Sequence, residues 1–221
     1  MHMKTKLYLF CIALLAPLIA YGGCRIERKT MPCKLLKTIS EREYSICLPA
    51  SYSETDNRTY PVLYLLHGGG THHTEWEENG RLQTVVDSLV AQGCMEEMII
   101  ICPEANKNNM IWFNAPHWKY EDYFFQELMP YMEQHYKIKA EKRYRGVAGF
   151  SMGGGASVVY GIHHPELFTM VFDMSGYLRR QPMEFLKNDP SAEWRQQLVE
   201  DCNPIPVILK ATKEQVENWK T

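Results

Sequence analysis

The stretch that most constrains this chain of 221 residues is the pentapeptide at 149–153, which reads G-x-S-x-G. A short apolar segment precedes it, and residues 154–163 follow with the apolar spacing of a short helix. A sharp strand-to-helix turn of this kind lifts the serine hydroxyl out of the sheet. Only very small side chains fit two residues to either side, which accounts for Gly149 and Gly153. The pattern therefore predicts a strand, a tight turn and a helix, with Ser151 as a nucleophile.

A second stretch is consistent with this chemistry. The apolar run 61–66 ends in His67-Gly68-Gly69-Gly70, as a buried strand opening into a glycine loop would. Attack by a serine needs two backbone N–H donors for the developing oxyanion, and losing one costs about 3–4 kcal/mol of barrier. Met152 would supply one N–H and a glycine of 68–70 the other. A glycine loop alone could be only a tight turn, but beside the 149–153 motif it predicts an oxyanion hole.

Three segments together carry a resemblance to a known family. They are Y-L-L-H-G-G-G at 64–70, E-D-Y-F-F-Q-E-L-M-P-Y at 121–131 and A-G-F-S-M-G-G at 148–154. With them the chain resembles the esterase D, feruloyl esterase and acetylxylan esterase group of α/β-hydrolases, from about Ile39 to its end. The resemblance implies a nucleophilic Ser151 and oxyanion donors at Gly69 and Met152. It also implies a secreted carboxylic-ester hydrolase that forms an acyl-enzyme, on acetyl or feruloyl esters of polysaccharides, without a cofactor.

Strand and helix patterns alternate along the chain, which predicts a doubly wound α/β fold with a mostly parallel sheet of α/β-hydrolase type. Parallel strands are expected at 62–66, 98–102, 145–150 and 170–174, and helices at 81–92, 120–136 (interrupted by Pro130), 154–163 and 189–200. The segment T-K-E-Q at 212–215 predicts a capping box at the start of a last short helix. Two short antiparallel strands are expected within 35–48, with a turn at 41–43.

The remaining members of a catalytic triad are not evident. In α/β-hydrolases the order along the chain is serine, then the acid, then histidine, but no histidine here follows His164. His163 lies twelve residues along the helix from Ser151, roughly 18 Å at 1.5 Å per residue. We therefore expect that the triad Asp and His are absent, that the chain is C-terminally truncated and lacks the last strands, and that turnover is low. A non-catalytic glycan-binding protein of the same fold, or an inactive fragment, is the alternative.

The loop 104–119 is rich in aromatic and amide side chains. Because it follows the carboxyl end of a predicted parallel strand, Trp112 and Asn114 are candidates for substrate binding. The alternative is that the tryptophans only cover the core. His72, His73 and Glu75 resemble a metal-binding set, but without a third convergent ligand a solvated loop is the better interpretation, and no metal is expected.

Residues 1–23 have the pattern of an export signal, in which Lys4 and Lys6 precede an apolar run of about thirteen residues, too short to span a bilayer. Cys24 after two glycines suggests a lipoprotein anchored to a membrane through that residue, although Tyr21 fits the pattern poorly. The expected location is the periplasm, the outer membrane or the extracellular space. Residues 24–221 are expected to form one domain.

Composition excludes several other classes of function. The formal net charge of −2 gives no reason to expect binding to nucleic acid or to an anionic membrane surface. The seven cysteines include no C-x-x-C pair, so neither a zinc site nor a redox pair is predicted from them. The sequence leaves open whether one disulfide forms after export, and it does not assign the pair. The partner that the family resemblance implies is a small ester or an acylated polysaccharide.

Overall fold

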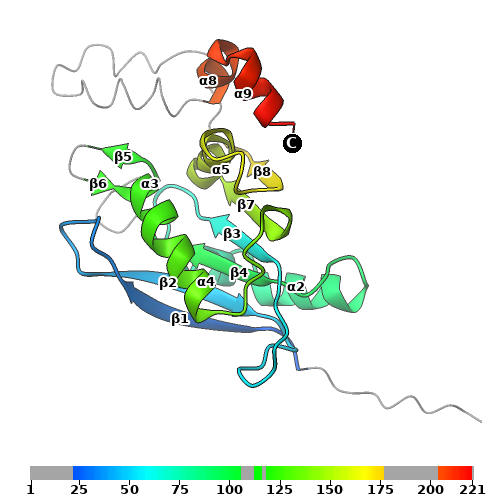
Figure 1. Ribbon diagram of the computed structural model, residues 1–221. Helices are drawn as coiled ribbons and strands as arrows, with labels where there is room; N and C mark the ends of the chain where they lie inside the picture. Colours follow the sequence, from blue (N-terminus) through cyan, green and yellow to red (C-terminus); the bar gives the residue numbers. More distant parts are fainter. Residues whose placement is uncertain (1–21, 106–111, 116–117, 177–203, 221) are drawn as a thin grey trace, which may run out of the picture.

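The computed structural model describes residues 22–105, 112–115, 118–176 and 204–220 (Figure 1). Its main sheet has six strands in the order β1-β2-β4-β3-β7-β8. These strands are β1 (Arg25–Pro32), β2 (Glu41–Leu48), β3 (Val62–Leu66), β4 (Ile99–Pro103), β7 (Arg145–Phe150) and β8 (Met170–Met174). The four strands β4, β3, β7 and β8 run parallel, and β2 and β1 continue the sheet in antiparallel pairing. The four predicted parallel strands are confirmed.

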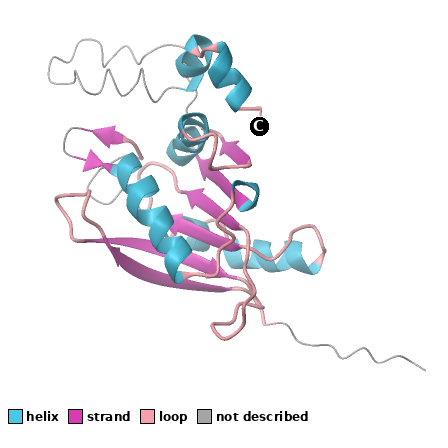
Figure 2. Cartoon of the chain, viewed as in Figure 1, coloured by secondary structure: helices cyan, strands magenta, loops and turns pink. Residues whose placement is uncertain are grey.

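Helices and short elements connect these strands (Figure 2). The helices are α1 (Glu75–Glu78), α2 (Leu82–Ala91), α3 (Tyr120–Tyr123), a π-helical turn (Phe124–Leu128), α4 (Met129–His135), a 3₁₀ turn (Lys142–Tyr144), α5 (Met152–His163), α8 (Pro204–Lys210) and α9 (Lys213–Asn218). A small hairpin is formed by β5 (Asn114–Ala115) and β6 (Trp118–Lys119). Among the described helices, none has the length and apolar character needed to cross a bilayer.

The parallel strands bury side chains on both faces of the sheet. Along β3, Tyr64 and Leu66 join the larger core cluster, which also contains residues of α3, α4 and α5. The intervening Leu65 joins a second cluster with Leu82 and Val86 of α2. Because successive side chains of a strand point to opposite faces, helices must cover both. The fold is therefore the expected doubly wound α/β arrangement.

The predicted antiparallel strands within 35–48 are partly wrong. The structure has β1 at Arg25–Pro32, and residues 41–43, predicted as a turn, lie inside β2. β1 pairs with β2 along its whole length and forms the edge of the sheet (Figure 1). The sequence R-I-E-R-K gives this strand an exposed, charged surface, as edge strands often have, so it lacks the apolar run by which the other strands were recognised.

Pro130 does not end the helix in which it lies. The chain continues from α3 to α4 as one rod, with a π-helical turn at Phe124–Leu128 directly before the proline (Figure 1). A proline in a regular α-helix lacks the N–H donor and its ring clashes with the carbonyl four residues earlier. A π turn provides a wider local loop of backbone, and the α-helix then resumes at Met129.

The last described segment bears out one local prediction. Thr212 caps α9 by accepting the Gln215 N–H at 3.2 Å, and the Gln215 side chain accepts the Thr212 N–H at 2.8 Å. This reciprocal pair is the predicted capping box. Residues 1–21 of the predicted export signal, the helix predicted at 189–200 and Cys202 lie outside the described residues. In β8, which lies at the edge of the described sheet, Phe172 is 57% exposed.

Candidate active site

Ser151 lies between the end of β7 and the start of α5 in a rare backbone conformation. Its φ is 51° and its ψ is −113°, and it is one of three described residues other than glycine with positive φ. Such a conformation costs roughly 1–3 kcal/mol and persists only where neighbouring structure enforces it. Here the Ser151 N–H donates to the Met174 carbonyl of β8 at 2.9 Å, and the Ser151 carbonyl accepts the Gly155 N–H at 3.1 Å. The strand, sharp turn and helix predicted from the sequence are present.

The two glycines that flank the serine have no room for a side chain. A Cβ atom on Gly149 would overlap the Gly153 carbonyl, and a Cβ atom on Gly153 would lie 2.5 Å from the Leu66 carbonyl oxygen. The second contact joins the turn to the end of β3. The glycines therefore let the turn close and let the start of α5 pack against the neighbouring strand, as the sequence predicts.

The glycine loop after β3 lies beside the first residue of α5. The position of a Cβ atom on Gly69 is 3.8 Å from the Cβ and Sδ atoms of Met152. The Gly68 N–H is already occupied, because it donates to Glu75 Oε2 at 2.7 Å. Gly69 is exposed, so its backbone faces solvent next to the turn at residues 149–153, which we call the elbow. This arrangement puts the two residues expected to supply oxyanion donors, Gly69 and Met152, side by side.

Glu75 organises this loop, a role that sequence reasoning missed. Besides the Gly68 N–H, its Oε2 atom accepts the Thr71 hydroxyl at 2.8 Å, and the Thr71 hydroxyl oxygen also lies 3.0 Å from the Gly68 carbonyl oxygen. Glu75 is the first residue of α1. The sequence feature that could have indicated this role is a carboxylate in the first turn of a helix directly after a glycine loop. Such carboxylates often accept hydrogen bonds from backbone N–H groups.

We expect Glu75→Ala to lower the free energy of unfolding by about 1–3 kcal/mol, because it leaves the buried Gly68 N–H without an acceptor. Glu75→Gln retains an acceptor oxygen and should recover most of the loss. Glu77→Ala removes a partner of Arg28 at the surface and should cost about 1 kcal/mol or less. Urea denaturation followed by circular dichroism measures all three, and equal losses for Glu75→Ala and Glu77→Ala would contradict this role.

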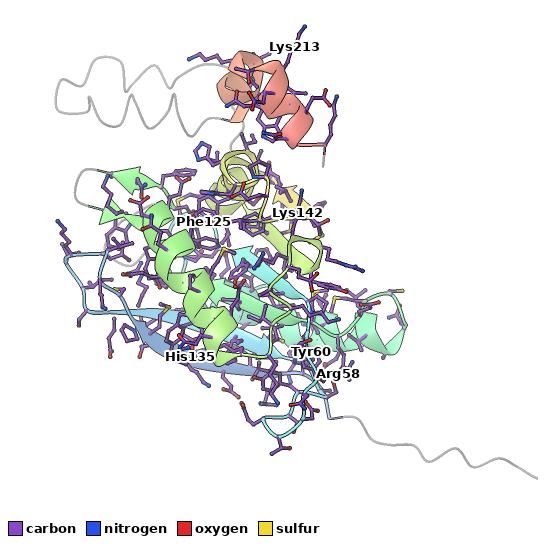
Figure 3. All side chains as sticks on the ribbon, viewed as in Figure 1. Arg58, Tyr60, Phe125, His135, Lys142 and Lys213 are labelled. Carbon is purple, nitrogen blue, oxygen red and sulfur yellow. The ribbon has the colours of Figure 1, made fainter. Side chains whose placement is uncertain are left out.

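The described histidines are engaged away from the elbow. His67 Nε2 accepts the Ala105 N–H at 3.0 Å, and the His163 ring is 2.6 Å from a Glu121 oxygen. The His164 ring packs 3.7 Å from that of Phe125, and His135 lies at the end of α4, where its ring stacks on Tyr131 (Figure 3). Within the described residues, no hydrogen bond joins a histidine ring to Ser151. His2 and His117 lie outside them.

Asp173 is an acidic residue of β8 that lies beside the elbow. In the register of the sheet it is paired with Gly149 of β7. One carboxylate oxygen occupies the space where a Cβ atom of Gly154 would be, at the first turn of α5. Negative charge near a helix N-terminus is favourable. Within the described residues this oxygen, Oδ1, is buried without a hydrogen-bond partner.

The proposed substrate-binding role of Trp112 is not supported by its position. Its side chain is 0% exposed and its indole N–H donates to the His67 carbonyl at 3.2 Å. Trp112 also packs edge-on against Tyr120, and its carbonyl accepts the Tyr160 hydroxyl. It therefore belongs to the core, which was the alternative interpretation. Asn114 is half-buried and its amide donates to Asp122 Oδ1 at 2.9 Å, so a substrate-binding role for it stays a prediction.

A serine held at positive φ between a parallel strand and a helix, with a glycine loop at the end of the adjacent strand, defines the α/β-hydrolase class. The chain belongs to the Esterase family, whose model matches residues 37–221.

Relatives with known names agree with this assignment. The chain is 30% identical over 132 residues to an endo-1,4-beta-xylanase/feruloyl esterase of Xylanibacter ruminicola. The matched region covers 56% of this chain and 18% of the relative. It is 32% identical over 142 residues to an esterase of Mycobacterium tuberculosis, covering 60% of this chain and 28% of the relative. The chain therefore matches less than a third of the length of either curated relative.

Solved structures share the fold. A ferulic acid esterase superposes with a TM-score of 0.78 at 32% sequence identity, covering 89% of this chain and 75% of that one. A CE1 ferulic acid esterase from Anaeromyces mucronatus superposes with a TM-score of 0.63 at 26% identity, covering 74% of this chain and 63% of that one. The predicted resemblance to esterases of the feruloyl esterase group is confirmed.

Proposed function

We propose that this chain is a secreted carboxylic-ester hydrolase with Ser151 as its nucleophile. The observation that carries the proposal is the strained backbone of Ser151 next to Met152 and the exposed backbone of Gly69. Strain at a half-buried serine, held by hydrogen bonds to β8 and within the first turn of α5, is typical of a preorganised catalytic turn.

In the proposed reaction the Ser151 hydroxyl oxygen attacks the ester carbonyl carbon. The carbonyl oxygen becomes an oxyanion, held by the N–H groups of Gly69 and Met152, and the N-terminal end of α5 favours the same negative charge. The alcohol then leaves and an acyl-enzyme remains, which water hydrolyses to the free acid. The serine proton must pass to a base. None of the described histidines contacts Ser151 as such a base. We therefore expect slow acylation for esters with poor leaving groups.

The substrates we propose are acetyl or feruloyl esters of polysaccharides. Two relatives of at least 30% identity carry feruloyl or ferulic acid esterase in their names. Asn114, on the β5–β6 hairpin, is the described residue that we propose to contact the substrate.

Export, and membrane anchoring through a lipid on Cys24, are part of the proposal and rest on the sequence of residues 1–24. The Cys24 side chain is 2% exposed and packs in the cluster that contains Cys47 and Leu82. A lipid on this sulfur would require the side chain to turn out of that cluster. Mass spectrometry of the mature N-terminus from a bacterial host tests both steps.

A second candidate function is glycan binding without catalysis. The absence of a hydrogen bond between any described histidine and Ser151 favours it, because an unassisted serine hydroxyl is a weak nucleophile. Under this alternative the chain would bind a feruloylated or acetylated oligosaccharide and release no acid.

Chromatography of the reaction products separates the two candidates. The purified chain and its Ser151→Ala variant are incubated with feruloylated arabinoxylan and acetylated xylan oligosaccharides. We expect ferulate or acetate release by the wild type above that of the variant. Binding of these oligosaccharides by calorimetry without release of either acid would support the binding protein and contradict the esterase.

A further inference from the structure

Three ligand-type side chains from three different segments meet behind the glycine loop. They are Glu43 of β2, His73 of the loop between β3 and α1, and Glu104 directly after β4. One ring nitrogen of His73 and one carboxylate oxygen of each glutamate all lie within 4.8 Å of one another. Glu43 and Glu104 are neighbours across two strands, since the Glu104 N–H donates to the Glu43 carbonyl at 3.2 Å. The sheet therefore sets the spacing of the two carboxylates.

The imidazole of His73 has a hydrogen-bond partner on one ring nitrogen. Its Nδ1 atom lies 2.8 Å from the Ser45 hydroxyl, and its backbone N–H donates to Glu104 Oε2 at 3.0 Å. A hydrogen bond on one ring nitrogen is the usual arrangement for a histidine that coordinates through the other, here Nε2.

Two carboxylates meet at the cluster. Glu104 is 1% exposed, and two carboxylates held close together on adjacent strands repel each other, so a cation between them is favourable. Among the described residues, Arg42 is a positive charge at this site, with its Nη2 atom 3.9 Å from Glu104 Oε1. The His67 Nε2 atom, 3.6 Å from the same oxygen, is already an acceptor for a backbone N–H, so that ring nitrogen carries no proton. The His72 ring lies 3.5 Å from the other carboxylate oxygen.

We propose that Glu43, His73 and Glu104 form a binding site for one divalent transition-metal cation, of the class of Zn²⁺. An imidazole with two carboxylates suits zinc better than calcium or magnesium, which prefer oxygen ligands alone. Zinc ligands stand about 2.0–2.2 Å from the ion, so the three side chains must close on it. Glu43 and His73 are only half-buried and can do so. The bound ion would fix the loop that carries Gly69 to strand β2.

Isothermal titration of the purified chain with Zn²⁺ tests this site. The Cys94→Ser background removes the exposed thiol, which could otherwise bind zinc. We expect one Zn²⁺ per chain and a rise in the thermal unfolding midpoint that increases with Zn²⁺ concentration. No saturable binding in the folded protein would overturn the proposal.

Matched variants assign the ligands. His73→Ala and Glu43→Gln should each weaken Zn²⁺ binding at least tenfold, whereas His135→Ala and Glu54→Gln, exposed residues elsewhere, should leave it unchanged. Circular dichroism confirms that each variant is folded. Because there are two ligand variants, the test still stands when one of them does not fold. Co²⁺ provides a spectroscopic check, with visible d–d bands and no thiolate charge-transfer band expected. Unchanged affinity in both ligand variants, or a thiolate band, would overturn the assignment. The site does not depend on the esterase activity.

Discussion

Gly149→Ala should lower the free energy of unfolding by about 3 kcal/mol or more. The added methyl group would overlap the carbonyl of Gly153 and approach the backbone nitrogen of Gly154. Overpacking against side chains typically costs about 1–3 kcal/mol, and here the obstacle is backbone at the start of α5, which cannot rotate away. A typical domain is stable by only about 5–15 kcal/mol, so this is a large fraction of the total.

Gly93→Ala is the matched control. Gly93 follows α2 at a φ of 68°, with open space where a Cβ atom would lie. Alanine there introduces backbone strain without a clash and should cost about 1 kcal/mol. Urea unfolding of both variants, followed by circular dichroism, measures the difference. Equal losses for the two variants would mean that the close packing of the turn does not matter.

Ser151→Ala should reduce p-nitrophenyl acetate hydrolysis by at least about tenfold, because it removes the attacking oxygen but leaves the oxyanion donors. p-Nitrophenolate leaves without needing a proton, so this ester reports on attack by the serine even where a general acid is missing. In a complete triad, losing the serine costs about 10⁶-fold. We expect a smaller loss here, since no described histidine is hydrogen-bonded to Ser151.

Rates of p-nitrophenolate release by the two proteins at equal concentration measure this effect. Met170→Ser, on the exposed edge strand β8, is a control for surface substitution and should hydrolyse the ester like the wild type. Identical rates for wild type and Ser151→Ala would show that the hydrolysis does not pass through this serine. A loss near that of a complete triad would show that the chain contains a base outside the described residues.

Most of the sheet could be predicted from the sequence because buried parallel strands have a distinctive composition. Segments such as V-L-Y-L-L in β3 and I-I-I-C-P in β4 are apolar on both faces. β1 was missed because an edge strand needs only one buried face, and here charged residues dominate it. The π turn before Pro130 was missed because an α-helix and a π turn differ by local backbone geometry, not by an apolar pattern.

The elbow was predictable because its requirements are local, namely small residues at fixed distances from Ser151. The contacts of Glu75 were not, since its acceptor role depends on how the glycine loop folds back. The cluster of Glu43, His73 and Glu104 depends on strand pairing between residues far apart in the chain. For His72, His73 and Glu75 the sequence favours a solvated loop without a metal. In the structure Glu75 holds the glycine loop, and His73 lies beside two other carboxylates.

The central claim, that Ser151 is a nucleophile, is tested most directly by a fluorophosphonate probe and peptide mass mapping. The probe phosphonylates an activated serine once, so the result does not require turnover. The account predicts one adduct per chain, located on the peptide that contains Ser151 and absent from Ser151→Ala. A folded wild-type chain that carries no adduct after prolonged incubation, or carries it on another residue, would contradict the account.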